Sequence, residues 1–487
     1  MSECVRHARL EWAIIVGMTT FAAVVTTGIY CRPGCRARPL PGNVRPFPLA
    51  AAAEAAGYRA CLRCRPYRTQ ASIGWEGPEV VCRAVQLILD GALDGKTEHD
   101  LAARLFLSAR HLRRLFQECL GVTPDQLARS SRTHFARRLL DDTDLTIADV
   151  AFAAGFGSLR QFNRAYREIF RASPSELRAR RRASDRLVAD GGLALRLPFQ
   201  GPLDWEAMAG YLASRAITGV ESISGDAYRR TVVIDGDPGV LELSPGGNDH
   251  LLLRAHLPHW EGLIHIAQRA RRIFNLDADV ESATLHLRSD PVVGPLLRAR
   301  PGLRPPGTWD PFETGVRAII GQHIGVARAG AITARLVERL GTPVPGLQDL
   351  GLTHLFPSPE VLPGANLSGL GLTGARAAAI NAFARAVADQ IVRLDRGSRL
   401  DQFVEAVTAI PGLRTRTAQY LALRIGEPDA FPQADVGLRR SLSQGPIISP
   451  GEAERAAQRW RPWRAHAAIQ LWVCDSVPRS REPVLTR

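Results

Sequence analysis

Four of the eight cysteines stand in two close pairs, Cys31 with Cys35 and Cys61 with Cys64, and 25 residues separate the pairs. Two short cysteine pairs at this separation are typical of a tetrahedral zinc site. Four thiolates around one Zn²⁺ leave the cluster with a net charge of about −2. Because zinc keeps a bound thiol deprotonated, such a site can be a structural staple or can supply a thiolate nucleophile. The spacing alone leaves both possibilities open.

The size and charge of the chain indicate several domains and a polyanionic partner. The 487 residues are too many for one ordinary hydrophobic core, and 62 basic against 48 acidic residues give a net charge of +14. This excess favours nucleic acid over a membrane surface. Arginine-rich codon usage explains why Lys96 is the only lysine, but it does not explain the excess of base over acid. Cysteines in metal-type pairs favour a reducing compartment, the cytoplasm.

Composition changes along the chain divide it into four segments and predict a multidomain α+β protein. The predicted domains are residues 1–75, 78–180, 193–305 and 306–487. The first holds the paired cysteines and many prolines, the second is helical with an internal near-repeat, the third has strand-like runs and the fourth is helical. Arg178–Gly192 is charged and then rich in glycine, so we expect a linker there.

Two local patterns predict strands. The apolar run Trp12–Val25 is shorter than the ~20 residues that a membrane-spanning helix needs, so we expect a buried strand leading into the cysteine site and no membrane span. Thr231–Ile234 and Val240–Leu243 are also strand-like. The Asp-, Gly- and Pro-rich residues 235–239 between them predict a hairpin.

The residues around the cysteines resemble the N-terminal domain of Ada-type DNA repair proteins. Thr26-Thr-Gly-Ile-Tyr-Cys31-Arg-Pro-Gly-Cys35 and Ala56-Gly-Tyr-Arg-Ala-Cys61-Leu-Arg-Cys64 carry the resemblance. It implies that Cys31 accepts a methyl group from a DNA methyl phosphotriester, once per molecule, and that all four cysteines hold one zinc. The methylated ligand is neutral, so weaker repulsion from DNA phosphates could act as an affinity switch. The chain has no Pro-Cys-His-Arg motif, so the resemblance supports one methyl-accepting cysteine.

Two segments about 50 residues apart echo each other and predict a double helix-turn-helix. Each has a small residue where two helices cross, a serine at a helix N-cap, and an apolar stripe beside exposed arginines. A generic helical bundle is the alternative. The segments resemble the all-α AraC-type DNA-binding domain, with Phe106 standing where the second turn has Gly155. The resemblance implies that two reading helices face DNA, with the candidates Arg110, Arg113, Arg114, Arg160, Gln161 and Asn163.

The C-terminal segment resembles the helix-hairpin-helix base-excision glycosylases, closest to the AlkA-type 3-methyladenine glycosylases. The resemblance rests on Asp310–Gln322, Ile410–Arg424, Ala430–Leu438 and Trp460–Trp472. Residues 193–305 fit the α+β N-terminal domain of that subfamily. The resemblance implies that Asp435 is the catalytic carboxylate, although a lone aspartate is more often a helix cap. A buried carboxylate can stabilise the oxocarbenium-like sugar or orient water once the base is flipped out.

The same resemblance assigns the remaining site residues. Trp472 matches the pocket aromatic, with Gln322 and His323 at the wedge that enters the duplex, and Gly412 and Arg414 in the DNA-binding hairpin. Arg414 replaces the second hairpin glycine, and Arg416 stands where the family often has an aromatic residue. Residues 193–487 contain no lysine, which excludes a side-chain Schiff base, and too few cysteines for an iron–sulfur cluster.

Together these features predict an adaptive-response protein that repairs alkylated DNA and activates transcription. It would accept methyl groups on Cys31 and excise alkylated purines of the 3-methyladenine type by monofunctional hydrolysis. The alternative is a DNA-binding regulator whose glycosylase half is inactive. Arg414 leaves this alternative open, because it replaces a glycine of the DNA-binding hairpin. Expected partners are double-stranded DNA and RNA polymerase, with the chain a monomer near the nucleoid.

Overall fold

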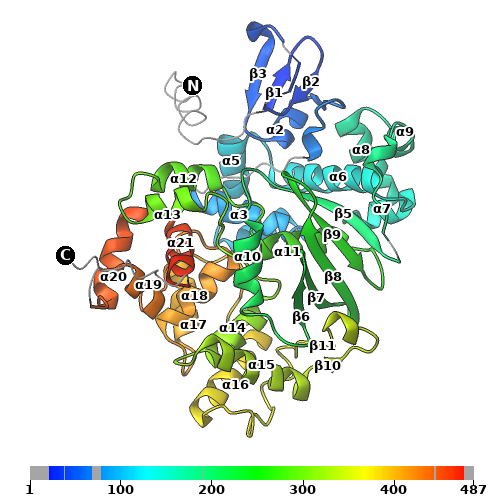
Figure 1. The fold of residues 1–487 in the computed structure, drawn as a ribbon. Helices are drawn as coiled ribbons and strands as arrows, with labels where there is room; N and C mark the ends of the chain where they lie inside the picture. The colour runs from blue at the N-terminus through cyan, green and yellow to red at the C-terminus, as the bar shows by residue number, and fades with distance from the viewer. Residues whose placement is uncertain are drawn as a thin grey trace, which may run out of the picture.

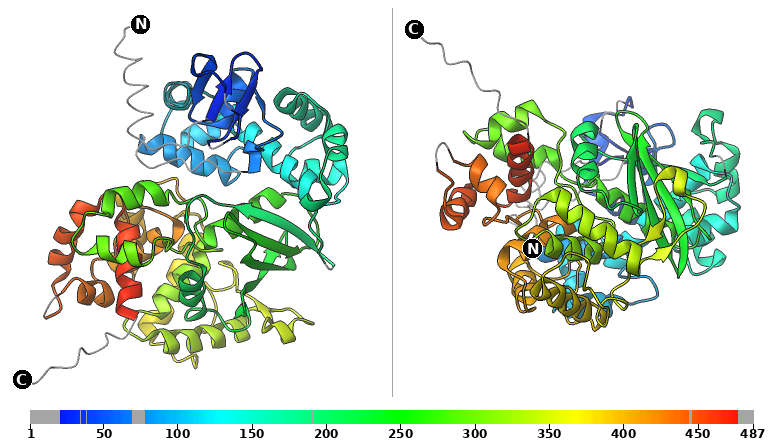
Figure 2. Two further views of the ribbon diagram at one scale, coloured as in Figure 1. Left: turned by 45° about the horizontal axis from the view of Figure 1, so that its top comes forward. Right: turned by 60° about the horizontal axis from the view of Figure 1, so that its bottom comes forward.

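The computed structural model describes residues 21–33, 35–37, 39–68, 78–189, 191–443 and 446–476. Figure 1 places the small N-terminal sheet at the top of the molecule and the C-terminal helices at the lower left. In Figure 2 the N-terminal half lies against the glycosylase-like half. No helix among the described residues is long and apolar enough to cross a membrane.

The N-terminal domain is a four-stranded sheet of order β3-β1-β2-β4, covered by one helix. The end of the apolar run Trp12–Val25 forms strand β1, as predicted, and its first nine residues lie outside the described part. Phe21 and Tyr30 pack edge to face at 5.8 Å between ring centroids. The elements are β1 (Phe21–Val24), β2 (Ile29–Cys31), β3 (Val44–Phe47), α2 (Ala50–Ala55) and β4 (Arg59–Ala60).

The second domain is helical and contains two helix-turn-helix units, as the repeat predicts. Ser108 and Ser158 cap the two reading helices, and each hydroxyl accepts a hydrogen bond from the backbone three residues on. Phe106 and Gly155 occupy equivalent left-handed turns, with φ of 57° and 78°. The backbone of Phe106 is therefore strained, whereas Gly155 adopts the same conformation without a steric penalty. The elements are α3 (Glu79–Leu89), α4 (Glu98–Arg104), α5 (Ala109–Leu120), α6 (Pro124–Asp142), α7 (Ile147–Ala153), α8 (Leu159–Phe170) and α9 (Pro174–Ala179).

A five-stranded antiparallel sheet of order β5-β9-β8-β7-β6 follows. The predicted hairpin is confirmed: β7 pairs with β8 across a two-residue turn, Asp235-Gly236, with both residues at positive φ. The buried faces of α10, α11 and the second helix-turn-helix unit share one hydrophobic core with this sheet. The elements are β5 (Leu193–Pro198), α10 (Trp205–Ala213), β6 (Glu221–Ser224), β7 (Ala227–Ile234), β8 (Asp237–Pro245), β9 (His250–His256) and α11 (Leu263–Ile273).

The C-terminal helices surround a separate core. α12 and α13 precede residue 306, yet their buried side chains belong to this core and α13 packs against α21. A two-stranded ribbon, β10 (Thr342–Pro343) with β11 (His354–Leu355), reaches back to the large sheet. The helices are α12 (Val280–Leu287), α13 (Val293–Ala299), α14 (Pro311–Ile320), α15 (Val326–Leu340), α16 (Gly374–Ala388), α17 (Leu400–Thr408), α18 (Thr415–Ile425), α19 (Val436–Ser441), α20 (Pro450–Ala457) and α21 (Arg464–Ser476).

Charged pairs fasten the first helix-turn-helix unit to the glycosylase-like half. Arg83 of α3 is 4% exposed and lies 2.8 Å from Glu427. Arg104 of α4 pairs with Asp395 at 2.6 Å. Removing one partner of a buried pair such as Arg83–Glu427 is costly, because it leaves the other charge without compensation. The two halves therefore form a shared, polar interface rather than separate bodies on a tether.

The predicted linker Arg178–Gly192 is not a free tether where the structure describes it. Its first two residues end α9, and residues 183–185 form a short 3₁₀ turn. Tertiary charge pairs hold this stretch in place: three aspartates pair with arginines of the zinc domain and of the large sheet, in a cluster that we call the aspartate clamp. Asp142 lies 2.6 Å from Arg196 of β5, and Asp185 lies 2.7 Å from Arg65. The clamp consists of Arg65, Arg68, Asp141, Asp142, Asp185 and Arg196.

His466 of α21 is buried in the helical core, beside Trp463 and near Arg304. Burial, with a contribution from Arg304, lowers the pKa of His466 to about 3. The imidazole is neutral in the fold, whereas an unfolded chain binds a proton below about pH 6.5. Its contribution to stability is therefore complete above pH 6.5 and is lost as the pH falls towards 3.

We expect a matched pair of pH titrations to detect this group. Between pH 6 and pH 4, the free energy of unfolding of the wild type should fall by about 1 kcal/mol per pH unit more than that of His466→Gln. Thermal denaturation of both full-length proteins at a series of pH values measures the two slopes. Parallel slopes would show that His466 does not titrate on unfolding.

Candidate zinc centre and active site

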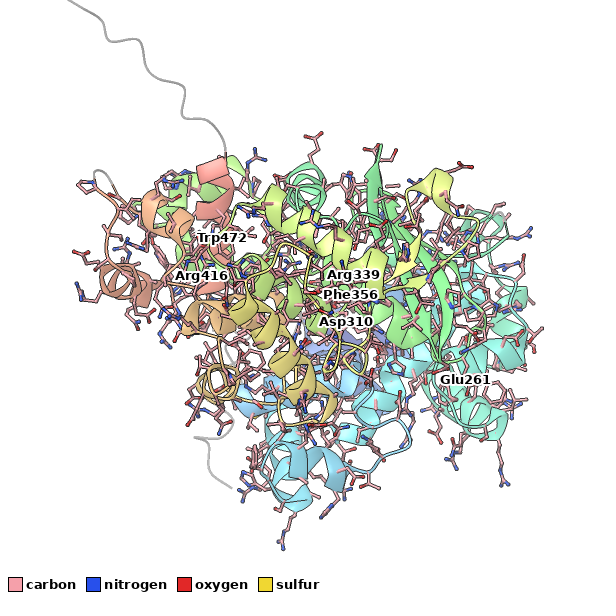
Figure 3. The ribbon with its side chains drawn as sticks, turned by 90° about the horizontal axis from the view of Figure 1, so that it is seen from below. Glu261, Asp310, Arg339, Phe356, Arg416 and Trp472 are labelled. Carbon is pink, nitrogen blue, oxygen red and sulfur yellow. The ribbon has the colours of Figure 1, made fainter. Side chains whose placement is uncertain are left out.

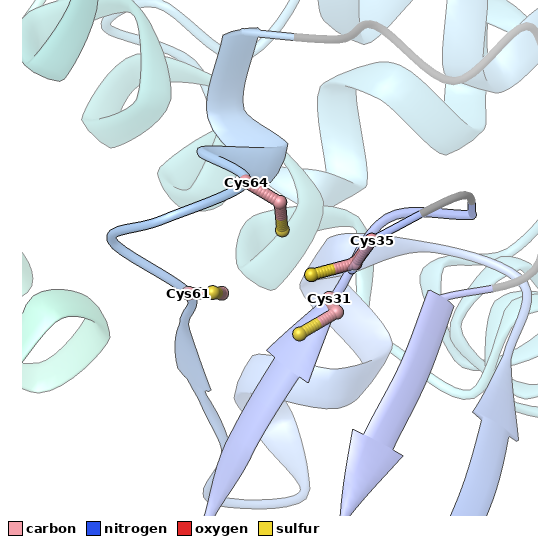
Figure 4. A group of neighbouring side chains, drawn as sticks. All are labelled: Cys31, Cys35, Cys61 and Cys64. Atoms are coloured by element: carbon pink, nitrogen blue, oxygen red, sulfur yellow. The ribbon is translucent and has the colours of Figure 1, made fainter. Parts of the chain in front are cut away.

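The four cysteines converge at one end of the N-terminal sheet. β2 and β4 run parallel, with Tyr30 beside Ala60, so Cys31 and Cys61 leave the sheet side by side. The four sulfur atoms all lie within 4.8 Å of one another (Figure 4). An all-sulfur donor set of four is the shell that zinc prefers in closed sites. The structure thus brings together the four residues that the spacing selects as zinc ligands.

The zinc centre contacts the helix-turn-helix domain through α6. Tyr30 donates a hydrogen bond to Glu54 at 2.6 Å, and Glu54 also lies 2.6 Å from His134 of α6. Burial, together with the Glu54 charge, raises the pKa of Tyr30 well above its usual value. Arg65, directly after Cys64, enters the aspartate clamp. Residues on both sides of the metal ligands are therefore linked to the DNA-reading domain.

The predicted DNA-contacting side chains lie on α5 and α8. Arg110, Arg160 and Gln161 are exposed. Arg113 is exposed but paired with Glu98 at 2.6 Å, and Arg114 lies 2.9 Å from Nδ1 of His111. The half-buried Asn163 donates to the carbonyl of Leu159 in its own helix at 2.9 Å. Three of the six candidates are thus presented to solvent, and the side chains of the other three make contacts within the domain.

Asp435 combines a helix cap with a hydrogen bond from Trp472, the residue predicted as the pocket aromatic. Its Oδ1 accepts from the backbone amides of Gly437 and Leu438, at 3.0 and 3.2 Å, and so caps α19. The same oxygen accepts from Nε1 of Trp472 at 2.9 Å. The N-terminus of a helix favours negative charge. The carboxylate is therefore fixed by three donors on one oxygen.

Asp435 also lines a cavity. Oδ2 lies 3.9 Å from Arg416, and Figure 3 shows Arg416 and Trp472 as neighbours. The cavity has a volume of about 250 Å³, several times the roughly 30 Å³ that a water molecule occupies in the liquid. Its lining includes Arg215, Arg317, Arg416, Tyr420, Arg424 and Asp435.

Tyr420 shows the positive field of this cavity. Burial would raise its pKa, but Arg424, Arg215 and a hydrogen bond with Tyr211 bring the pKa down to about 8. Arg424 donates to the phenol oxygen at 2.9 Å. The Tyr420 ring also contacts Trp472 edge to face, with 6.1 Å between centroids. The arginines of the cavity lining therefore stabilise a negatively charged or electron-rich group placed beside them.

The predicted wedge and hairpin residues lie together, beside the cavity lining. Gln322 donates to the hydroxyl of Thr417 at 3.1 Å and reaches the carbonyl of Gly412 at 3.5 Å. His323 is exposed at the tip of this loop with φ of 59°, a strained, left-handed backbone. Gln322 thus braces the loop against the hairpin, and His323 projects from it.

Arg414 fits the hairpin backbone without strain. Gly412 has φ of 86°, which needs glycine, whereas Arg414 has φ of −128° and precedes α18 in an extended conformation. The exposed Arg414 side chain can reach solvent or a phosphate. The substitution at this position therefore does not disrupt the hairpin.

Sequence reasoning missed four cavity residues: Arg215, Arg317, Tyr420 and Arg424. Arg416, Tyr420 and Arg424 follow one another at intervals of four on α18, a helical stripe that the sequence displays. Nothing local marks Arg215, which follows α10 far away in the sequence.

The fold and site define a helix-hairpin-helix DNA glycosylase fused to a zinc domain and a helix-turn-helix domain. Four family models match in order: the metal binding domain of Ada at residues 18–67, a helix-turn-helix domain at 101–180, the AlkA N-terminal domain at 194–310, and the HhH-GPD superfamily of base excision DNA repair proteins at 316–465. These matches confirm the predicted multidomain α+β architecture.

Relatives extend over almost the whole chain. The "Probable bifunctional transcriptional activator/DNA repair enzyme AlkA" of Mycobacterium tuberculosis H37Rv is 39% identical over 467 residues, 95% of this chain and 94% of the relative. DNA-3-methyladenine glycosylase 2 of Escherichia coli K12 is 32% identical over 57% of this chain and 96% of its own length. The 3-methyladenine DNA-glycosylase structure from Archaeoglobus fulgidus matches 58% of this chain and 98% of its own with a TM-score of 0.51, and at 20% identity it shows the fold. This chain belongs to the bifunctional transcriptional activator/DNA repair enzyme AlkA family.

Proposed function

We propose that the C-terminal half is a monofunctional DNA glycosylase in which Asp435 performs the chemistry. The observation that carries this proposal is the position of Asp435, which lines a cavity of about 250 Å³ and has its Oδ1 fixed by three donors. A carboxylate held in this way stabilises positive charge on the sugar as the glycosidic bond breaks, and it orients water towards C1′. Alkylated purines of the 3-methyladenine type are the proposed substrates.

Release of free base from alkylated DNA tests the proposal. The wild type should liberate 3-methyladenine and leave an abasic strand intact, because residues 193–487 offer no lysine for a Schiff base. Borohydride should accordingly trap no covalent adduct between that half and the DNA. Strand cleavage with trapping would contradict the monofunctional mechanism. DNA binding without release of any base would instead establish the regulator-only alternative.

We propose that the zinc centre accepts a methyl group on Cys31 from a DNA methyl phosphotriester. The phosphotriester O–CH₃ bond breaks as the thiolate sulfur bonds to the methyl carbon, and the phosphate oxygen keeps the electron pair. Zinc would hold the thiolate of Cys31 deprotonated, and Cys35, Cys61 and Cys64 would complete its shell. The product thioether removes one negative charge from the cluster.

This charge change supports a regulatory role. A less negative protein surface binds DNA more tightly, and the two helix-turn-helix units present exposed Arg110 and Arg160. The chain carries both units itself, so we propose that a monomer reads two successive groove segments and recruits RNA polymerase. Because both activities act on DNA, we place the protein at the nucleoid in the cytoplasm.

A further inference from the structure

The zinc domain packs against the second reading helix, α8. Buried Tyr30 and Tyr67 of the zinc domain belong to the same hydrophobic core as Phe170 at the end of α8. The rings of Tyr67 and Phe170 meet edge to face, with 5.7 Å between their centroids. Strand β4 also contacts α8, and Arg171, the C-cap of that helix, donates to the carbonyl of Gly57 at 3.4 Å. A rearrangement inside the zinc domain can therefore reach α8 through direct contacts.

Three polar side chains, which we call the Glu54 triad, cross this domain boundary. Tyr30 and His134 both approach Oε1 of Glu54, and the Tyr30 hydroxyl lies 3.3 Å from Nε2 of His134. The His134 ring in turn lies 6.1 Å from the ring of Phe170. Oε2 of Glu54 is buried and has no hydrogen-bond partner among the described residues. A buried polar network that is only partly satisfied has more to gain from rearrangement than a complete one.

Methylation of Cys31 would disturb the strand that carries Tyr30. Cys31 is only 6% exposed, and a close-packed site takes up an added methyl group by moving its neighbours. Tyr30 precedes Cys31 in β2, and its carbonyl accepts a hydrogen bond from the amide of Cys61 at 3.0 Å. Side chains of adjacent strand residues point to opposite faces. A shift of β2 at Cys31 therefore moves the Tyr30 hydroxyl relative to Glu54.

We propose that the Glu54 triad carries the methylation state of Cys31 to α8, so that the second reading helix responds to it. This inference rests on the methyl transfer proposed above and names the route by which that transfer regulates DNA binding. Tyr30 and His134 are positioning residues in this route. A loss of charge alone strengthens the attraction to any DNA, whereas a change at α8 also alters the contacts of exposed Arg160 and Gln161 with one groove segment.

The gain in DNA affinity upon methylation measures this route. Full-length protein is methylated with a short methyl-phosphotriester oligothymidylate, and its affinity is measured for a duplex selected in vitro with the methylated wild type. Tyr30→Phe keeps the ring and removes the hydroxyl, so it should accept the methyl group while its affinity gain is at least about fivefold smaller than that of the wild type. Amide hydrogen exchange at the end of α8 should change upon methylation in the wild type and stay constant in this variant.

Tyr67→Phe is the matched control for Tyr30→Phe. It removes a buried hydroxyl that donates to Asp141 of α6 at 3.0 Å, across the same domain boundary but outside β2. This variant should keep the full affinity gain. His134→Leu lies on α6 away from the cysteines and should lose the gain as Tyr30→Phe does. Because both residues act through Glu54, the double variant should lose no more than either single variant.

The outcomes separate this route from the function on which it rests. Peptide mass spectrometry verifies the methyl group in each protein, and thermal midpoints verify that each variant is folded. Tyr30→Phe and His134→Leu variants that keep the full gain overturn the route alone, and so does a Tyr67→Phe variant that loses it equally. A methylated wild type without any gain in affinity overturns the regulatory function proposed above and this route with it. A wild type that accepts no methyl group overturns the methyl transfer itself.

Discussion

Replacing Asp435 with asparagine should reduce base excision by a factor on the order of 10³, the loss expected when a preorganised charge is removed from a reaction centre. Asparagine keeps the shape of the side chain and is as good a helix N-cap as aspartate. Its carbonyl oxygen can accept the same three hydrogen bonds that reach Oδ1 of Asp435 from Gly437, Leu438 and Trp472. The substitution therefore removes the charge and leaves the local structure in place.

Single-turnover release of 3-methyladenine measures the loss, and binding to abasic DNA measures what remains. We expect the binding to change little, because the hairpin and wedge are intact. Asp401→Asn is the control, since it neutralises an exposed carboxylate on α17. If the Asp435→Asn variant excises at a rate near that of the wild type, the carboxylate is not catalytic and Asp435 serves only as a helix cap.

Replacing Cys31 with serine should abolish methyl transfer, because serine offers no thiolate nucleophile. Wild-type protein purified without chelator should contain one zinc per chain, and native mass spectrometry counts it. After incubation with methyl-phosphotriester DNA, peptide mass spectrometry should find one added methyl group, on Cys31. The methylated protein should also bind promoter DNA more tightly at low salt, with a gain that shrinks as salt rises.

Cys119→Ser provides the comparison for this experiment, since Cys119 lies on α5 outside the cluster. That variant should keep its zinc and its methyl acceptance. A methyl group on another cysteine, or transfer in the Cys31→Ser variant, would refute the assignment of the acceptor. Absence of zinc from the wild type would remove the physical basis of the reaction.

The sequence was most informative where function depends on short-range spacing. The cysteine pairs, the serine caps and the Asp235-Gly236 turn are local patterns, and the structure confirms each as a zinc-type cluster, two helix caps and a hairpin. From the sequence alone, Asp435 could be either a helix cap or the carboxylate of the active site. In the structure it caps α19 and also lines the cavity, so the two interpretations are compatible.

Features made by tertiary contact were not predictable in this way. Arg215 reaches the cavity from a loop about 200 residues before Arg416, so no window of sequence contains both. The stretch Arg178–Gly192 has the composition of a linker, yet Asp185 is ordered by Arg65 from another domain. In the second case, a long-range charge pair overrides what the local composition predicts.

The aspartate clamp also bears on how this gene fusion can evolve. Asp142 belongs to the DNA-reading domain, but its 2.6 Å partner Arg196 belongs to the sheet of the repair half, and Arg68 arrives from the zinc domain. Exchanging one of these domains for a homologue that lacks its clamp residue would leave a buried charge without its counterpart, which is strongly destabilising. Recombination at this junction is therefore penalised unless the incoming domain carries the matching charge. The clamp in this way couples the descent of the repair enzyme to that of the regulator.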